Sequence, residues 1–103
     1  GYATSRAGMT HFARAAAVQL GADNIRVNTV LPGWTVTPFT QSVLEDAAGT
    51  EWRNRRVPLG RWATAAEIAN GILFLASDDA SYVTGSELLM DGGTTAWWGP
   101  GPD

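Results

Sequence analysis

The chain has 103 residues, a net charge of −3 and no cysteine, so it can hold one small domain at most. The absence of cysteine excludes disulfide frameworks, thiol nucleophiles and zinc–cysteine sites. With 45% apolar and 17% charged residues, we expect a folded, soluble chain without a membrane span. No basic cluster is long enough to follow a phosphate backbone, so we expect no nucleic-acid partner.

The first predicted element is a helix over residues 3–20, followed by a stop at Gly21. Apolar residues recur on one helical face with spacings of three and four, namely Met9, Phe12, Ala13, Ala16, Ala17 and Leu20. Residues 25–31 are short, rich in β-branched side chains and bounded by turn residues, which predicts a strand. A helix, a tight loop and an apolar strand form half of an α/β unit, and this order favours a parallel sheet.

The middle of the chain is predicted to contain two short helices. Thr37 is a good N-cap, and Pro38 suits the first helical position, so a helix is expected over residues 38–48. Gly49 should break it, and a second helix should cover residues 50–56. A loop over residues 57–60 follows.

The last third is predicted as a helix and a strand. Thr64 and Glu67 have the spacing of a capping box, which opens a helix to residue 76. A turn at residues 83–85 leads to a strand over residues 87–90, which Asp91-Gly92-Gly93 closes. Residues 94–103, rich in Gly, Pro and Trp, are expected to have no regular structure.

Tyr2 and Arg6 are four residues apart and should share one face of the first helix. A cation near a phenol favours the phenolate and lowers the pKa from its ordinary value of about 10. Such a phenol can exchange a proton with a carbonyl or alcohol oxygen near neutral pH. From the spacing alone, an exposed tyrosine and arginine at a helix start is the simpler interpretation.

The loop from Pro32 to Thr37 lies where a strand passes into a helix. Ligands of open α/β sheets bind beyond the carboxyl ends of the strands. Gly33 would let a ligand approach the backbone, and Thr35 and Thr37 supply hydroxyl and amide groups. The helix start at Thr37 also suits an anionic or amide-bearing ligand, although an ordinary capped turn explains the same residues.

A series of short motifs is more specific than any of its members. In chain order they are Tyr2-Ala3-Thr4-Ser5-Arg6, Ile25-Arg26-Val27-Asn28, Pro32-Gly33, Thr37-Pro38, Pro58-Leu59-Gly60-Arg61, Glu67-Ile68-Ala69, Phe74-Leu75-Ala76-Ser77-Asp78, Thr84-Gly85 and Asp91-Gly92-Gly93. This series closely resembles the C-terminal half of the short-chain dehydrogenases/reductases, from Tyr2 to about Thr95. The resemblance implies that residues 1–95 are the C-terminal part of a Rossmann-type, doubly wound parallel α/β sheet, with residues 96–103 as a tail.

The resemblance also assigns roles to residues. Tyr2 matches the family's catalytic acid/base, and Arg6 matches the lysine that assists it and contacts the nicotinamide ribose. The cofactor, NAD or NADP, would be held by a loop containing Pro32, Gly33, Thr35 and Thr37. Residues 38–56 match the substrate lid, and Trp34 is a candidate wall of the substrate pocket, with packing as the alternative.

By the same resemblance we expect an oxidoreductase that interconverts a secondary alcohol and a ketone. A cytoplasmic homodimer or homotetramer, built partly on the helix over 64–76 and the last strand, is also implied. No metal site is expected.

Two departures from the family pattern qualify this interpretation. Arginine replaces lysine at position 6; it keeps the charge but is a poorer proton relay. The family's glycine-rich phosphate loop, cofactor-selecting residue, Asn-Ala-Gly strand and catalytic serine precede the tyrosine and do not occur in this chain. We therefore expect the 103 residues alone to be inactive. The alternative is a non-catalytic remnant of the family or an oligomerisation element.

Overall fold

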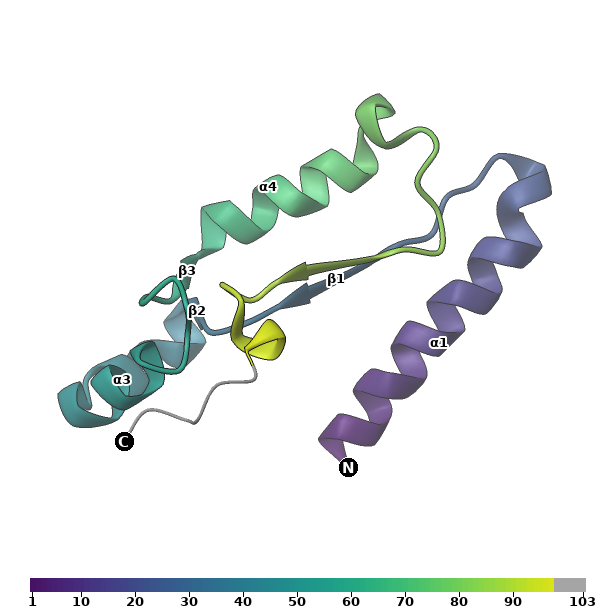
Figure 1. Cartoon of the computed structure of the whole chain (residues 1–103). Coiled ribbons are helices and arrows are strands. Elements are labelled where there is room, and N and C mark those ends of the chain that lie inside the picture. Colours follow the sequence, from purple (N-terminus) through teal and green to yellow (C-terminus); the bar gives the residue numbers. More distant parts are fainter. Residues whose placement is uncertain (98–103) are drawn as a thin grey trace. The chain divides into compact units, whose positions relative to one another are not determined.

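The computed structural model describes residues 1–97, apart from the side chains of residues 2 and 3 (Figure 1). The chain divides into two compact units, one of residues 1–31 and 71–88, the other of residues 32–70 and 89–103. Each unit is taken by itself below. Within the described part of the chain, no helix is both long enough and apolar enough to cross a membrane.

In the first unit, helix α1 runs from Tyr2 to Leu20 and agrees with the prediction. Gly21 follows it but is not the turning residue, because it keeps a right-handed φ of −59° and begins a 3-10 turn over Gly21–Asp23. The chain reverses at Asn24, whose φ is +59°. Asparagine tolerates this left-handed conformation better than most residues.

Small residues let α1 approach the turn before the last strand. Ala17 is 5% exposed, and a Cβ placed on Gly85 would lie 3.5 Å from the Cβ of Ala17. An ion pair of 3.2 Å between Arg14 and Glu87 joins the same two regions. Close packing is thus found at Ala17, whereas Met9 and Phe12 of the predicted apolar face are 63% and 73% exposed.

The extended segment before the first strand is held by side chains rather than by a strand ladder. Nη1 of Arg26 donates to the carbonyl oxygens of Leu75, at 2.7 Å, and Val83, at 3.2 Å; its Nη2 donates to that of Ser77 at 3.2 Å. The Asn28 amide donates to Val83 O at 2.9 Å, and its Oδ1 accepts from Ser86 N at 3.0 Å. The predicted strand over 25–31 is thus too long at its start.

The strand itself, β1, covers Thr29–Pro32 and pairs with β4, Glu87–Met90. Backbone hydrogen bonds run from Thr29 N to Ser86 O and from Gly33 N to Met90 O, each 2.9 Å. Both partners advance in the same direction, so the strands are parallel (Figure 1). The parallel sheet and the bounds of β4 are as predicted.

The second unit contains a small parallel pair that was not predicted. Strand β2, Thr35–Val36, pairs with β3, Ala63–Thr64, with Thr35 opposite Ala63. Two residues are too few for an alternating pattern to be visible in the sequence. This pair connects the segment just after β1 to the segment just before α4, the helix that starts at Ala65.

The helices between β2 and β3 differ from the prediction. A 3-10 turn, Pro38–Thr40, leads into α2, Gln41–Leu44, and α3 covers Ala47–Asn54. Gly49 lies inside α3 rather than between the helices. The break falls at Asp46, whose carboxylate accepts from Gly49 N at 3.3 Å and caps α3. An aspartate N-cap satisfies an orphan backbone donor, so it starts a helix where the glycine alone would not.

Helix α4 spans Ala65–Ala76 and ends before a 3-10 turn over Asp78–Ala80. The tail prediction is wrong for Thr94–Ala96, which form another 3-10 turn, whereas residues 98–103 lie outside the described ones. The described apolar side chains that are buried are Ala17, Val57, Trp62 and Ala80. With so few of them, polar contacts carry much of the local structure.

Replacing Gly33 by alanine is expected to destabilise the protein by about 1–3 kcal/mol, because the new Cβ would lie 2.7 Å from the Cα of Asp91. Denaturant unfolding measures the change. Gly8→Ala is the matched control: it lies within α1 with open space around the new methyl and should stabilise by about 0.5–1 kcal/mol. Equal effects at the two positions would contradict the close approach.

Candidate active site

The two candidate catalytic residues lie at the start of α1. Tyr2 is its first residue, and Arg6, which is exposed, follows one turn later. The helix therefore gives them the predicted spacing, while the orientation of the Tyr2 side chain stays outside the described structure. The cofactor and substrate candidates belong to the other unit.

Gly33, at the end of β1, has a packing role. Its Cβ position is filled by the main chain and Cβ of Asp91, at 2.7 and 2.9 Å. Asp91 is in turn held by its own loop, since its carboxylate accepts from Gly93 N, Thr95 N and the Thr95 hydroxyl at 2.7–2.9 Å. Burial raises the pKa of Asp91, but these hydrogen bonds outweigh it and lower the pKa overall. Close packing on Asp91 therefore accounts for this glycine without a ligand.

Threonine hydroxyls fasten the loop after Gly33. Thr35 Oγ1 donates to Gly33 O at 2.9 Å. Thr40 Oγ1 donates to Thr35 O at 2.8 Å and accepts from Thr37 N at 2.9 Å, while Thr40 N donates to Thr37 Oγ1 at 3.3 Å. Thr40 was not predicted as a site residue, although its spacing from Thr37 is that of a capping box.

The helix predicted to start at Thr37 is replaced by shorter elements. They are a three-residue 3-10 turn and the four-residue α2, in place of one helix to residue 48. A dipole grows from aligned peptide groups, so such short pieces contribute little of it. Any ligand of this loop would depend on its individual polar atoms.

Trp34 contacts an aromatic and a cationic side chain of the second unit. Its ring stacks on Trp62 with centroids 5.3 Å apart and an interplanar angle of 30°. The guanidinium carbon of Arg53 lies 5.6 Å from the Trp34 ring centroid, within cation–π range. Neither Trp62 nor Arg53 was singled out from the sequence, because only the folded chain brings them to Trp34.

Trp34 also lines a cavity of about 340 Å³. Residues from the loop after α3, the start of α4 and the end of β4 complete the lining: Val57, Leu59, Arg61, Ala63, Glu67, Ile68, Asn70, Met90, Asp91 and Gly92. The cavity therefore lies beyond the carboxyl ends of β1 and β4, where open α/β sheets bind ligands. This position fits both readings of Trp34, as a pocket wall and as a packing residue.

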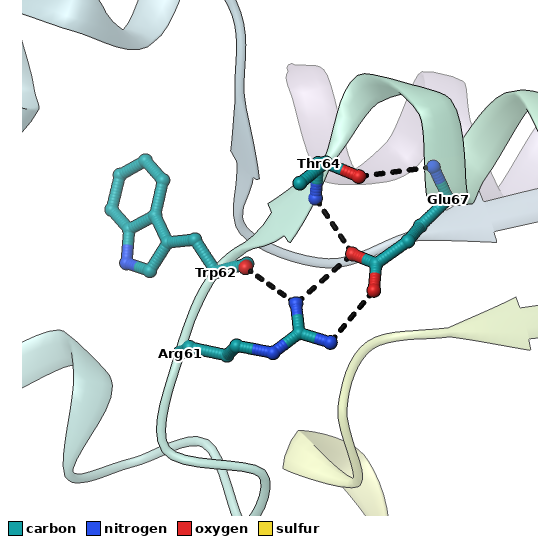
Figure 2. Close-up of polar contacts among 4 residues, drawn as sticks. All are labelled: Arg61, Trp62, Thr64 and Glu67. Carbon is teal, nitrogen blue, oxygen red and sulfur yellow. Dashed lines mark hydrogen bonds and ion pairs between the residues drawn. The ribbon is translucent and has the colours of Figure 1, made fainter.

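A polar cluster at this cavity confirms the predicted capping box (Figure 2). Thr64 N donates to Glu67 Oε2 at 2.8 Å, and Glu67 N donates to Thr64 Oγ1 at 3.1 Å. Arg61 adds two parallel hydrogen bonds to the carboxylate, of 2.6 and 3.0 Å. The Arg61 hydrogen bonds and the Thr64 amide lower the pKa of Glu67 to about 2.

Comparison with known proteins identifies the family. Residues 1–95 match the family model described as enoyl-(acyl carrier protein) reductase. The chain belongs to the short-chain dehydrogenase/reductase family. Among its relatives in this family is 3-oxoacyl-[acyl-carrier-protein] reductase of Thermotoga maritima, 47% identical over 92 residues, or 89% of this chain and 37% of that protein.

Solved dehydrogenase structures show the same fold. One of them is described as a 2-deoxy-D-gluconate 3-dehydrogenase from Agrobacterium tumefaciens and contains bound NADP. It superposes with a TM-score of 0.88 at 34% identity, and the match covers 93% of this chain and 39% of that one. A 4-hydroxyisoleucine dehydrogenase complexed with NADH gives 0.90 at 31% identity, covering 93% and 40%. The chain thus spans less than half the length of these relatives and corresponds to the C-terminal portion of the Rossmann fold.

The Glu67 cluster predicts a pH-dependent stability. Because the folded-state pKa lies below the ordinary value of 4.5, ionised Glu67 stabilises the fold above pH 4.5, and this contribution is lost as the pH falls toward 2. Glu67→Gln should be less stable than the wild type at pH 7, and the difference should shrink by pH 2.5. Denaturant unfolding between these pH values measures it.

Glu51→Gln, which removes a carboxylate from an exposed position on α3, is the control and should keep the wild-type pH dependence. A difference between wild type and Glu67→Gln that stays constant across the range would show that the Arg61–Glu67 contact does not stabilise the folded state.

Proposed function

We propose that these residues are the C-terminal part of an NAD(P)-dependent oxidoreductase that interconverts a secondary alcohol and a ketone. The observation that carries the proposal is the fastened loop at the carboxyl end of β1. Its Thr35 hydroxyl gives its proton to Gly33 O, so its oxygen keeps free lone pairs. A hydrogen-bond acceptor at this end of a parallel sheet suits the amide N–H groups of a nicotinamide.

The same loop offers a donor. If the Thr40 hydroxyl proton is directed to Thr35 O, the Thr37 hydroxyl is the donor in its 3.2 Å contact with Thr40 Oγ1. A ligand oxygen would then accept the Thr37 proton in place of Thr40 Oγ1. Pro32, Gly33, Thr35 and Thr37 would therefore hold the nicotinamide end of the cofactor, with Arg6 near its ribose. When bound, a nicotinamide cofactor supplies or accepts the hydride. The relatives solved with NADP and with NADH leave both forms open for this protein.

Tyr2 is proposed to carry the proton. During carbonyl reduction its phenol would donate a proton to the oxygen as the carbon receives hydride, and during alcohol oxidation the phenolate would take the proton back. Arg6, one helical turn away, would favour the phenolate through its positive charge. The substrate would lie against Trp34, which already contacts the cavity beyond the strand ends.

Further parts of the proposal concern the whole protein. A cytoplasmic homodimer or homotetramer remains our expectation from the family. We also infer that the 103 residues by themselves do not turn over a substrate. The pyrophosphate and adenosine of a dinucleotide require a glycine-rich turn, and the printed sequence does not contain one.

Replacing Tyr2 by phenylalanine in the full-length protein should lower kcat by about 100-fold or more, because a general acid of this kind contributes about that much. Cofactor affinity should change little, since the ring is retained. Stopped-flow and steady-state assays of NADH or NADPH oxidation, with cofactor titrations, measure both quantities. Tyr82→Phe, at a fully exposed tyrosine, is the matched control. Turnover retained in the Tyr2 variant would rule out its acid/base role.

Replacing Arg6 by lysine should raise the rate or shift the pH optimum of the full-length enzyme. Lysine keeps the charge and can also relay a proton, whereas an arginine side chain stays protonated. The pH–rate profile from pH 6 to 10 is the measurement. Arg14→Lys, on the same helix but paired with Glu87, should leave it unchanged. Identical profiles for wild type and the Arg6 variant would show that no relay passes through this position.

A further inference from the structure

We propose that the substrate is an uncharged ketone with an apolar body, and that the product is the corresponding secondary alcohol. This inference rests on the proposed oxidoreductase function and names its substrate class. It follows from the cavity beside Trp34, whose lining residues all belong to the second unit. The apolar walls of this cavity, its paired charges and its few free polar groups each support the assignment.

Apolar side chains form most of the cavity wall. They come from different segments of the second unit, namely Trp34, Val57, Leu59, Ala63, Ile68 and Met90. Trp34 is 43% exposed and Leu59 is 69% exposed, so both keep apolar surface that a ligand can cover. Covering such surface is favourable roughly in proportion to its area. The walls therefore favour a substrate with an apolar body.

The charges of Arg61 and Glu67 at the cavity are paired within the chain (Figure 2). Arg61 donates two parallel hydrogen bonds to the Glu67 carboxylate, at 2.6 and 3.0 Å, and a third to Trp62 O at 3.1 Å. Arg61 is the cation among the described lining residues, so a carboxylate or phosphate would find no unpaired positive charge there. An anion buried without a partner is costly, which disfavours acidic substrates.

Asp91 is the charge at the cavity that has no cationic partner among the described residues. Its carboxylate instead accepts from Gly93 N, Thr95 N and the Thr95 hydroxyl at 2.7–2.9 Å. These donors use most of the acceptor capacity of a carboxylate, which has about four lone-pair sites. The negative charge repels an anion but attracts a cation. An amine is therefore the competing substrate class.

Few polar groups of the lining are free to bind a substrate. Asn70 is exposed, and no described residue hydrogen-bonds its side-chain amide, which is a neutral donor and acceptor. One amide can serve one polar group of a substrate, whereas a sugar or polyol brings several hydroxyl groups. Each hydroxyl that is buried without a partner weakens binding. The lining therefore disfavours polyhydroxylated substrates.

The experiment compares four ketones with the full-length protein. Three share a cyclohexanone ring: methyl 4-oxocyclohexanecarboxylate is neutral, 4-oxocyclohexanecarboxylate is an anion and 4-aminocyclohexanone is a cation. D-ribulose is a neutral ketone rich in hydroxyl groups. A single ring suits a cavity of about 340 Å³, which lies at the lower end of ligand pockets. Oxidation of NADH or NADPH gives kcat/KM, which should be about 10-fold or more higher for the ester than for the other three.

Two substitutions should change the charge preference in opposite directions. Glu67→Gln leaves Arg61 without its counter-ion and should raise kcat/KM of the acid relative to the ester by about 3- to 10-fold. Arg61→Met leaves Glu67 uncompensated and should raise the amine relative to the ester by a similar factor. These ratios do not depend on the fraction of folded enzyme, so a destabilised variant still gives a result. Arg14→Met and Glu87→Gln break an ion pair outside the cavity lining and should leave both ratios unchanged.

A wild type that prefers the acid, the amine or D-ribulose to the ester would overturn the assignment. Ratios that do not move in Glu67→Gln and Arg61→Met would overturn it as well, because the substrate would then lie away from this cavity. If none of the four ketones is reduced, the proposed function itself fails. Calorimetric titration of the wild type then still tests the cavity: tighter binding of the ester than of the acid supports the assignment, and equal, weaker or absent binding of the ester refutes it.

Discussion

The close approach of Gly33 to Asp91 is the constraint on which the second unit depends. No side chain fits at position 33, because the main chain of Asp91 already occupies that space. Asp91 cannot withdraw easily, since Gly92 and Gly93 turn the chain with positive φ and Gly93 and Thr95 bind the carboxylate. The ends of β1 and β4 are thereby locked together. Because Trp34 directly follows Gly33, its main chain is held in position by this contact.

Hydrogen bonds from polar side chains stabilise loops and helix ends that a large apolar core would hold in bigger domains. Thr40 holds both ends of the loop after β1, and Arg26 binds the carbonyl groups at the C-terminal end of α4. The Leu75 carbonyl belongs to the last turn of α4, where carbonyl groups lack a partner within the helix, so the guanidinium satisfies it. Each such contact contributes on the order of 1 kcal/mol. The Thr40 contacts hold the candidate ligand loop, and the Arg26 contacts hold the chain before β1 to the segment after α4.

The elements that could be predicted from the sequence are those whose signals lie in residues close together along the chain. The Thr64–Glu67 capping box, α1 and β4 have local signals, and the structure contains them. The two-residue strands β2 and β3 have no such signal. The break assigned to Gly49 was misplaced because a glycine marks flexibility, whereas the helix start is decided by the acceptor on Asp46.

The candidate site divides in the same way. The spacing of Tyr2 and Arg6, and the loop from Pro32 to Thr37, were visible as motifs. Trp62 and Arg53 were not, because their importance comes from contact with Trp34, which lies well before them in the sequence. A stacking or cation–π contact has no fixed spacing along the chain. Contacts of this kind therefore become visible only in the folded structure, even where the family is evident from motifs.

Arginine at position 6 has a consequence for the proton chemistry if Tyr2 acts as proposed. A lysine ammonium can pass a proton onward because it can be deprotonated, but an arginine side chain stays charged under ordinary conditions. Arg6 can therefore favour the phenolate through its charge without joining a relay. Each turnover still requires Tyr2 to exchange one proton with solvent. That proton must then travel through water or through groups other than Arg6, which makes access of water to the start of α1 a functional requirement rather than an accident of its exposure.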